Sequence, residues 1–277
     1  MTVGFDTGFL EEKARKLRCN IIKMITAAGS GHPGGSLSAV DIITYLYFYW
    51  MRIVPENPKW EDRDRFILSK GHCCPALYAA LAEKGYFPED ELWTLRDIGS
   101  ILQGHPDMRK TPGVDMTSGS LGQGLSCAVG MALGGKLSGK DFKVYVMLGD
   151  GEIQSGQIWE AAMAANNYSL DNLTAIIDNN RLQCDGRTSS IMKVEPIAPR
   201  WQAFGWDVAV ADGHSFEDIH QTFISCNAQN GKPKMIIANT VKGRGVSFME
   251  DNHKWHGLPL DEAQADAAIR EIRGESL

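Results

Sequence analysis

The chain has 277 residues, of which 43% are hydrophobic and 22% charged, and this composition excludes a disordered or fibrous protein. Its formal net charge of −6 argues against a general nucleic-acid binder, which needs a basic face. No apolar run approaches the ~18 residues of a membrane span, and the amino-terminal segment lacks the apolar core of a secretory signal. The six cysteines show no CxxC spacing, so we expect reduced thiols in a soluble, cytoplasmic protein that binds neither nucleic acid nor membrane.

Helices dominate the predicted elements of the first half of the chain. Apolar residues recur there at helical spacing, and the first helix ends before Gly29, a favourable C-cap. Gly85 ends the third helix in the same way. The predicted helices span Leu10–Ala28, Leu37–Trp50, Pro75–Lys84 and Leu121–Leu137.

Short apolar strands alternate with amphipathic helices in the second half. The predicted strands are Val144–Leu148, Leu173–Ile177, Val208–Val210 and Met235–Ala238. The helices are Ile158–Ala165, Ala198–Phe204, Phe216–Ala228 and Asp261–Arg273. This alternation predicts an α/β fold with a mainly parallel sheet and helices on both faces. We expect residues 1–277 to form one domain, with helices 9–29 and 261–273 as peripheral elements.

Polar residues follow two strands that we expect to be neighbours in this sheet. Gly149-Asp150-Gly151 comes directly after the first strand, and Asn179-Asn180 comes after the second. Because ligands collect at the carboxyl ends of parallel strands, Asp150 and Asn180 can converge on one point. Together with the Leu182 carbonyl they make a set of hard oxygen donors, which suits Mg²⁺ or Ca²⁺ better than zinc. The flanking glycines leave room for a diphosphate.

The pair of motifs resembles the thiamine-diphosphate motif, GDG followed about thirty residues later by NN. Further motifs along the chain are similar to those of the amino-terminal half of transketolase, in the same order, from about Leu10 to Gly257. They are Gly31-His32-Pro33-Gly34-Gly35, Ser69-Lys70-Gly71-His72, Gly104-His105-Pro106, Gly119-Ser120-Leu121-Gly122-Gln123-Gly124, Lys242-Gly243-Arg244-Gly245 and Trp255-His256-Gly257. The resemblance implies the thiamine-diphosphate-binding fold, with thiamine diphosphate and Mg²⁺ (or Ca²⁺) as cofactors.

The same resemblance implies a role for individual residues. The metal ligands would be Asp150, Asn180 and the carbonyl of Leu182. Contacts to the cofactor are implied for His72, Ser120, Leu121, Gly122, Asp150, Gly151, Glu160, Asn180, Lys242 and His256. Catalytic roles, facing the reacting carbons and sugar hydroxyls, are implied for His32, His72, His105 and His256.

The residues themselves support these roles but leave alternatives open. A lone histidine is more often structural, whereas four histidines in loops with glycine or proline favour proton-transfer chemistry. The Gly119–Gly124 stretch is either a flexible helix entry or a loop whose free N–H groups hold an anion. Arg96, nine positions before His105, either faces the far end of a substrate or is an exposed helix residue.

One position departs from the family pattern. The chain has Ser155 where transketolases usually have glutamate, while Glu160 is retained. The two acids are thought to belong to a polar network that joins paired cofactors. Loss of one carboxylate therefore either weakens that network or is a tolerated substitution bridged by water.

The resemblance also implies a partner subunit. In the family, a second domain protonates and clamps the pyrimidine ring of the cofactor, and that domain would begin beyond Leu277. We therefore expect a split enzyme, an α2β2 assembly with a carboxy-terminal subunit, which transfers a two-carbon ketol unit from a ketose to an aldose. The isolated chain is expected to bind the cofactor weakly and to be inactive.

Other functions remain as alternatives. Another thiamine-diphosphate enzyme component, such as a deoxyxylulose-phosphate synthase or a 2-oxo-acid dehydrogenase α subunit, fits the motifs less well. A catalytically silent regulatory chain and a nicotinamide-binding domain are the remaining two. The substrate is open between ordinary pentose phosphates, as in the pentose phosphate pathway, and another ketose with an anionic tail.

Overall fold

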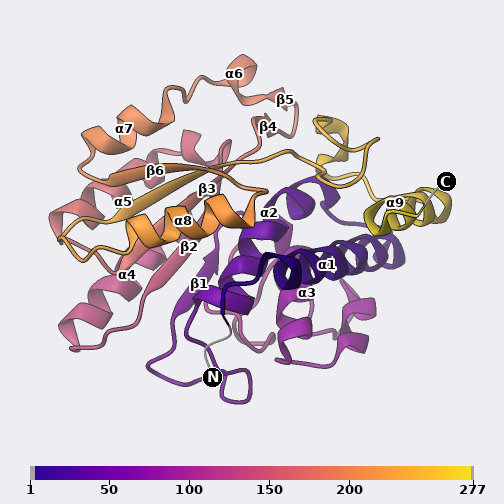
Figure 1. The fold of residues 1–277 in the computed structure, drawn as a ribbon, viewed down its shortest axis with the longest axis horizontal. Helices are drawn as coiled ribbons and strands as arrows, with labels where there is room; N and C mark the ends of the chain where they lie inside the picture. Colours follow the sequence, from indigo (N-terminus) through magenta and orange to yellow (C-terminus); the bar gives the residue numbers. More distant parts are fainter. Residues whose placement is uncertain (1–3, 276–277) are drawn as a thin grey trace.

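The centre of the molecule is a parallel sheet. The computed structural model describes residues 4–275, and within them five strands lie in the order β1-β2-β3-β7-β6, with every neighbouring pair parallel. Helices cover both faces of the sheet (Figure 1), which confirms the predicted α/β fold. The strands are β1 (Arg65–Leu68), β2 (Val144–Gly149), β3 (Leu173–Asn179), β6 (Asp207–Asp212) and β7 (Lys234–Asn239). A separate antiparallel ribbon pairs β4 (Leu182–Gln183) with β5 (Gly186–Arg187).

The helices follow the predicted periodicity with small shifts at their ends. They are α1 (Thr7–Ala28), α2 (Pro33–Tyr45), α3 (Cys74–Lys84), α4 (Gln123–Leu137), α5 (Gly156–Asn167), α6 (Thr188–Ile191), α7 (Ile197–Ala203), α8 (Phe216–Cys226) and α9 (Glu262–Arg273). Short segments of 3₁₀ or π helix occupy Leu46–Trp50, Gly71–Cys73, Glu89–Thr94, Glu152–Gln154 and His253–His256.

Helix ends are set by caps. Asp6 caps α1, because its side chain accepts a hydrogen bond from the Phe9 N–H at 3.1 Å. Gly29 ends the same helix in the left-handed region at φ 56°, as predicted. At the start of α4, Gly122 adopts φ 90°, so the helix begins at Gln123, two residues later than the sequence predicts.

Alternation along the strands divides the apolar core between the two faces of the sheet. In β2, Val144, Val146 and Leu148 pack into the cluster formed with α4, α5 and α7. Tyr145 and Met147 point the other way, into the larger cluster formed with α1, α2, α3 and α8. Successive residues of β2 point to opposite faces, and both faces are buried. The strand therefore reads as an unbroken apolar run.

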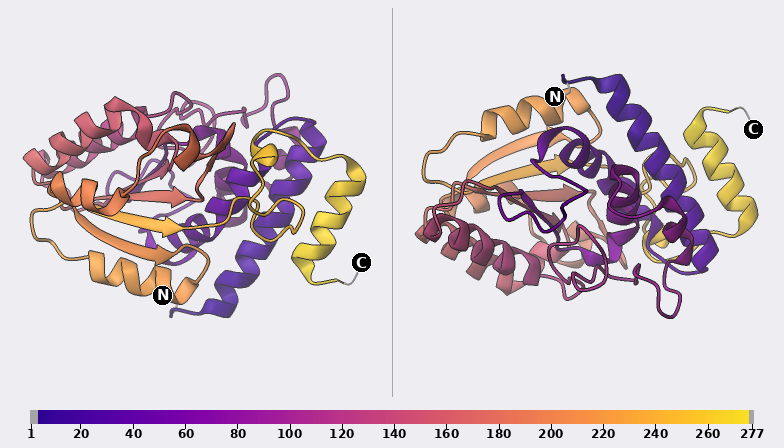
Figure 2. Two further views of the ribbon diagram at one scale, coloured as in Figure 1. Left: turned by 90° about the horizontal axis from the view of Figure 1, so that it is seen from above. Right: turned by 90° about the horizontal axis from the view of Figure 1, so that it is seen from below.

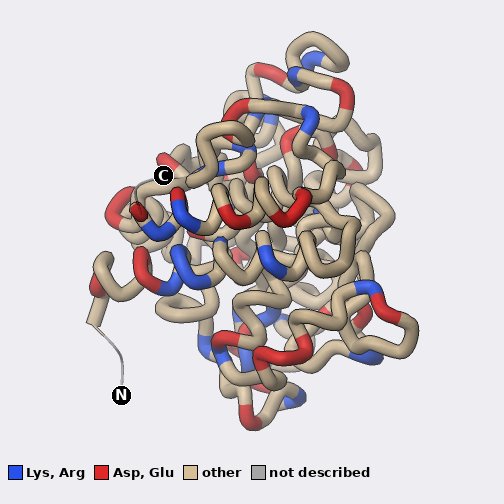
Figure 3. Tube along the Cα trace, turned by 90° about the vertical axis from the view of Figure 1, so that its right-hand side faces the viewer, with Lys and Arg blue, Asp and Glu red and all other residues tan. Residues whose placement is uncertain are grey.

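The two terminal helices lie together at one side of the sheet. Figure 2 shows α9 beside α1, and the two helices are in contact. Seen from that side, acidic and basic positions lie interspersed (Figure 3). In the described part of the chain, we find no helix with the length and apolarity needed to cross a bilayer.

Candidate functional site

The polar residues predicted at the strand ends do converge. β2 and β3 are neighbours with Gly149 opposite Asp178, so Asp150 and Asn180 leave the sheet side by side. They line a cavity of about 400 Å³. Most of the predicted site residues are on its wall, which consists of His32, Gly35, Lys70, His72, Gly119, Leu121, Gly149, Asp150, Gly151, Glu152, Gln154, Asn180, Leu182, Gln183, Cys184, Lys242 and His256.

Asp150 presents a buried carboxylate to this cavity. Only 3% of the residue is exposed, and its hydrogen bonds come from the backbone N–H groups of Gly151, at 2.7 Å, and Arg181. Burial, followed by the negative charge of Asp178, raises the pKa of Asp150 to about 6. A buried carboxylate in this state is stabilised by a cation, and a bound metal ion supplies one.

Asn180 and Leu182 add neutral oxygens beside that carboxylate. The amide oxygen of Asn180 accepts the Leu182 N–H at 3.0 Å, and its amide nitrogen donates to Ser38 Oγ at 3.2 Å. The Leu182 carbonyl accepts a hydrogen bond from Lys242 Nζ at 2.9 Å. Within residues 4–275, no three His, Cys, Asp or Glu side chains gather at metal-binding distance. A cation at this edge would therefore rely on carboxylate, amide and carbonyl oxygens, the donors that Mg²⁺ prefers.

A buried ion pair supports these ligands, and no sequence pattern predicts it. Lys70 Nζ contacts Asp178 Oδ2, and the two side chains are 3% and 0% exposed. Ser38 donates to the same carboxylate at 2.6 Å, and Thr240 donates to its other oxygen. Burial raises the pKa of Asp178, but the charge of Lys70 outweighs it and holds that pKa below the usual value. Lys70 lies within the Ser69-Lys70-Gly71-His72 motif, and Asp178 directly precedes Asn179-Asn180. These positions are the only sign of the ion pair in the sequence.

Three of the predicted histidines form a cluster on the wall of the cavity. The ring centres of His32, His72 and His256 lie 5.1 to 5.5 Å apart. His32 precedes α2, His72 lies in the turn after β1, and His256 lies in the turn before α9, so three distant segments meet here. His256 Nδ1 is 2.8 Å from Lys242 Nζ.

Burial keeps these imidazoles neutral at physiological pH. It lowers the pKa of His32 to about 4, with further contributions from Arg96 and His105. It lowers the pKa of His256 to about 3, where the charge of Lys242 adds to the effect, and that of His72 well below its ordinary value. Burial also lowers the pKa of Lys242 itself to about 8, assisted by the charge of Lys70. Neutral rings can both donate and accept protons at substrate oxygens.

These lowered pKa values predict a pH dependence of stability. The pKa of His32 is about 4 in the folded state and about 6.5 in the unfolded state. Between these pH values the unfolded state binds a proton and the folded state does not, so the folded state loses stability as the pH falls towards 4. The free energy of unfolding of the wild type should therefore drop relative to that of His32→Gln between pH 6.5 and 4. Urea unfolding at several pH values measures the difference. His253→Gln, at an exposed histidine, provides the control, and an equal pH trend for wild type and His32→Gln would contradict the prediction.

Other predicted residues lie outside the wall of the cavity. His105 is exposed, although its ring is close to Gly119: a Cβ at Gly119 would come within 3.1 Å of its Cδ2. Burial and the nearby charge of Arg96 lower the pKa of His105. Ser120 and Glu160 are exposed, Glu160 on α5, so the structure does not bring them to the cavity.

Glu152 fixes the glycine-rich loop and was not predicted. Its carboxylate accepts the N–H groups of Gly122 and Gly149, each at 2.9 Å, and the hydroxyl of Ser69. The Gly122 N–H is therefore engaged by Glu152 and is not itself free to hold an anion. Ser155 packs against the same glycine, because a Cβ there would lie 2.9 Å from Ser155 Oγ.

Arg96 follows the 3₁₀ turn and is only partly exposed, so the interpretation as an exposed helix residue is wrong. It adopts φ 69°, a left-handed conformation that is costly for a residue with a side chain. Its Nη1 donates to Ser30 Oγ at 2.8 Å, while its buried Nε has no hydrogen-bond partner among the described residues. The guanidinium therefore retains donor capacity near His32 and His105.

Comparison with known proteins agrees with this geometry. Residues 10–275 match the family described as "Transketolase, thiamine diphosphate binding domain". The chain is 48% identical over 264 residues to one subunit of the apulose-4-phosphate transketolase of Phocaeicola vulgatus, covering 95% of this chain and 93% of that protein. It is 47% identical over 266 residues to the SqwG subunit of the 6-deoxy-6-sulfo-D-fructose transketolase of a Clostridium species, covering 96% and 97%.

Single-chain transketolases match over the same region. The human enzyme is 45% identical over 264 residues, which are 95% of this chain and 42% of that protein. The crystal structure of the Campylobacter jejuni enzyme superposes with a TM-score of 0.92 at 33% identity, covering 98% of this chain and 44% of that one. The chain thus spans about two-fifths of the length of these single-chain relatives. It belongs to the transketolase family, in which it corresponds to the amino-terminal, thiamine diphosphate-binding part.

Proposed function

We propose that this chain is the amino-terminal subunit of a thiamine-diphosphate-dependent transketolase, a transferase that moves a two-carbon ketol unit from a ketose to an aldose. The observation that carries the proposal is the buried Asp150 carboxylate beside the Asn180 and Leu182 oxygens, in a cavity lined by neutral imidazoles. The chain covers nearly the full length of relatives that are themselves named as transketolase subunits.

In this proposal one side of the cavity holds Mg²⁺ and the diphosphate. Asp150, Asn180 and the Leu182 carbonyl ligate the ion, and these three ligands leave room for phosphate oxygens in its coordination sphere. Lys242 and Gly151 contact the diphosphate, since Lys242 is a buried cation on the cavity wall and Gly151 presents backbone without a side chain. When bound, the cofactor supplies a thiazolium ring that accepts electrons from the transferred unit.

The imidazoles act on the substrate in this proposal. His32 and His256 stay neutral in their partly buried positions, so each can accept a proton from a substrate hydroxyl and return it. A ring N–H that faces a carbonyl oxygen also stabilises the negative charge that develops there. His105, on the neighbouring loop, extends this polar rim outward.

The surroundings of Arg96 favour a substrate with an anionic group. Its guanidinium has an unused donor beside His32, and no carboxylate forms a salt bridge with it among residues 4–275. The two subunit relatives are named for apulose-4-phosphate and 6-deoxy-6-sulfo-D-fructose, both of which carry an anionic group. We assign the donor to ketoses with a phosphate or sulfonate tail.

A partner chain completes the enzyme in this proposal. The subunit relatives bear names that imply a second subunit, and the single-chain relatives have more than half of their length beyond the matched region. The partner would carry the pyrimidine-binding domain, and an α2β2 assembly would place each cofactor between subunits. The six free thiols are compatible with a cytoplasmic site of action.

Reconstitution with the carboxy-terminal subunit tests this proposal. We expect the purified pair, with Mg²⁺ and thiamine diphosphate, to transfer a ketol unit from at least one member of a panel of ketose phosphates and sulfonated ketoses. The chain by itself should bind the cofactor weakly and show no transfer. Efficient turnover by the single chain, or a pair that binds NAD in place of thiamine diphosphate, would refute the proposal.

A further inference from the structure

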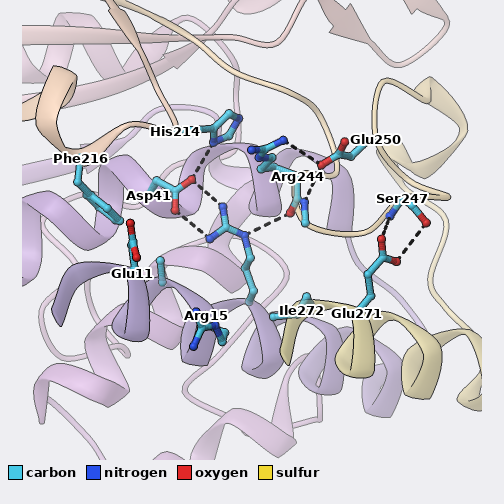
Figure 4. A pocket seen from close by; sticks show the side chains of 13 residues that line it. Glu11, Arg15, Asp41, His214, Phe216, Arg244, Ser247, Glu250, Glu271 and Ile272 are labelled. Atoms are coloured by element: carbon cyan, nitrogen blue, oxygen red, sulfur yellow. Dashed lines mark hydrogen bonds and ion pairs between the residues drawn. The ribbon is translucent and has the colours of Figure 1, made fainter. Parts of the chain in front are cut away.

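A second polar network lies on the outer side of the site, between α1, α2 and the loops that follow β6 and β7 (Figure 4). At its centre is Asp41 of α2, which is 4% exposed. Arg18 of α1 donates two hydrogen bonds to its carboxylate, at 2.8 and 2.6 Å. His214, from the loop after β6, approaches one of the same oxygens with Nδ1 at 2.7 Å. Burial opposes ionisation of Asp41, yet the charge of Arg18 and the His214 bond hold its pKa below the usual value.

The side chain of each partner of Asp41 makes one further hydrogen bond, and both bonds are to the loop that carries Lys242. The Val241 N–H donates to His214 Nε2 at 2.8 Å. Arg18 Nε donates to the Arg244 carbonyl at 3.2 Å. The two contacts therefore hold the backbone on either side of Lys242. The Val241 bond also fixes the tautomer, because Nε2 must accept and Nδ1 must carry the proton that faces Asp41.

The loop between these two contacts is closely packed. The Gly243 N–H donates to the Gly34 carbonyl at 2.9 Å, and Gly243 adopts φ 80°. A Cβ at Gly243 would lie 2.5 Å from the Met249 carbonyl oxygen, so the loop has little room to shift. Because the backbone is held in this way, the side chain of Lys242 enters the cavity and places Nζ between Leu182 O and His256 Nδ1.

We propose that Asp41, acting through Arg18 and His214, positions Lys242 for the diphosphate of the cofactor. This inference rests on the proposed function, and it assigns Asp41, Arg18 and His214 as positioning residues that do not touch the cofactor. A helix-to-helix ion pair would require only Arg18 and Asp41, whereas here both partners of the carboxylate continue to the same loop. The carboxylate is required because both partners donate to it, and an asparagine offers one acceptor oxygen and one donor nitrogen.

A double-mutant cycle with Lys242 tests the inference. We expect His214→Asn to weaken the affinity of the two-chain protein for Mg²⁺–thiamine diphosphate by about 10- to 100-fold. This range is typical of residues that orient a ligating residue without touching the ligand. Asparagine keeps a donor near the position of Nδ1, so its pairing with Asp41 is retained while the acceptor for Val241 is lost. In a Lys242→Met background, where Asp150 and Asn180 still hold the metal, His214→Asn should cause no further loss.

A second variant and a matched control separate positioning from simple stability. Asp41→Asn should behave as His214→Asn does, with loss of affinity in the wild-type background only. Glu271→Ala removes the two hydrogen bonds that Ser247 donates to α9 in the same cleft, at 2.8 and 3.2 Å, and should leave the affinity unchanged. Calorimetric titration with Mg²⁺ and thiamine diphosphate measures the affinity, and thermal unfolding without cofactor measures stability.

The outcomes are distinct. Equal losses of affinity for His214→Asn in the wild-type and Lys242→Met backgrounds would overturn the inference, as would a drop in stability with unchanged affinity. Absence of binding by the wild-type pair would instead refute the proposed function, and the inference with it. Loss confined to the background that retains Lys242 would establish the three residues as positioning residues.

Discussion

Replacing Asp150 by asparagine is expected to reduce Mg²⁺-dependent binding of thiamine diphosphate by ~100-fold or more, because it removes the single carboxylate from the proposed ligand set. The remaining ligands, Asn180 and the Leu182 carbonyl, are neutral and hold a divalent cation weakly. Asparagine also places an N–H₂ group near the donating N–H of Arg181, where the carboxylate now accepts. Calorimetric titration of the two-chain protein, with and without Mg²⁺, measures the loss.

The same variant should also change how the stability of the apoprotein depends on pH. Because the pKa of Asp150 is raised to about 6, the folded state takes up a proton before the unfolded state does, and the wild type gains stability as the pH falls from about 6 to 4. The gain is on the order of 2–3 kcal/mol and is absent from Asp150→Asn. Asp185→Asn, at an exposed carboxylate nearby, should change neither property. Unaltered cofactor affinity in Asp150→Asn would contradict the assigned role.

The second large effect is expected at the buried ion pair. Asp178→Ala leaves the Lys70 ammonium buried without its partner, which costs about 3–5 kcal/mol. We expect a fall of roughly 10 °C in the unfolding temperature. The pH dependence has a definite sign: since the pKa of Asp178 is lowered, its contribution is present above about pH 4 and is lost as the pH falls further.

Two comparisons test this account of the pair. The double variant Lys70→Met, Asp178→Leu should recover much of the lost stability, because an apolar pair needs no desolvated charge. Asp141→Asn breaks an exposed pair with Arg52, where the side chains of Arg52 and Asp141 are 43% and 79% exposed, and should leave the unfolding temperature almost unchanged. A loss in Asp178→Ala as small as that in Asp141→Asn would show that the buried pair contributes little.

Helices and strands could be predicted well where a periodic pattern of apolar residues extends over a long segment. The helix from residue 10 to 28 and the strand beginning at Val144 match the structure to within a few residues, because burial imposes their patterns. β1 was not predicted, since its four residues begin with Arg65 and carry no alternation. The β4–β5 ribbon is too short to leave a pattern.

The site could be predicted only in part, for a related reason. Asp150 and Asn180 stand directly after strands, so strand order by itself brings them together. The Lys70–Asp178 pair joins residues 108 positions apart, and the His214–Asp41 contact spans 173. Such contacts depend on how helices and loops pack on the sheet, which local sequence patterns do not specify.

The most direct test of a divalent ion at the ends of β2 and β3 is a crystal structure of the two-chain protein with Mn²⁺ and thiamine diphosphate, recorded at a wavelength where manganese scatters anomalously. We predict one anomalous peak within about 2.0–2.4 Å of a carboxylate oxygen of Asp150, the amide oxygen of Asn180 and the carbonyl oxygen of Leu182. Cofactor density with no such peak, or a peak held by other side chains, would contradict the account.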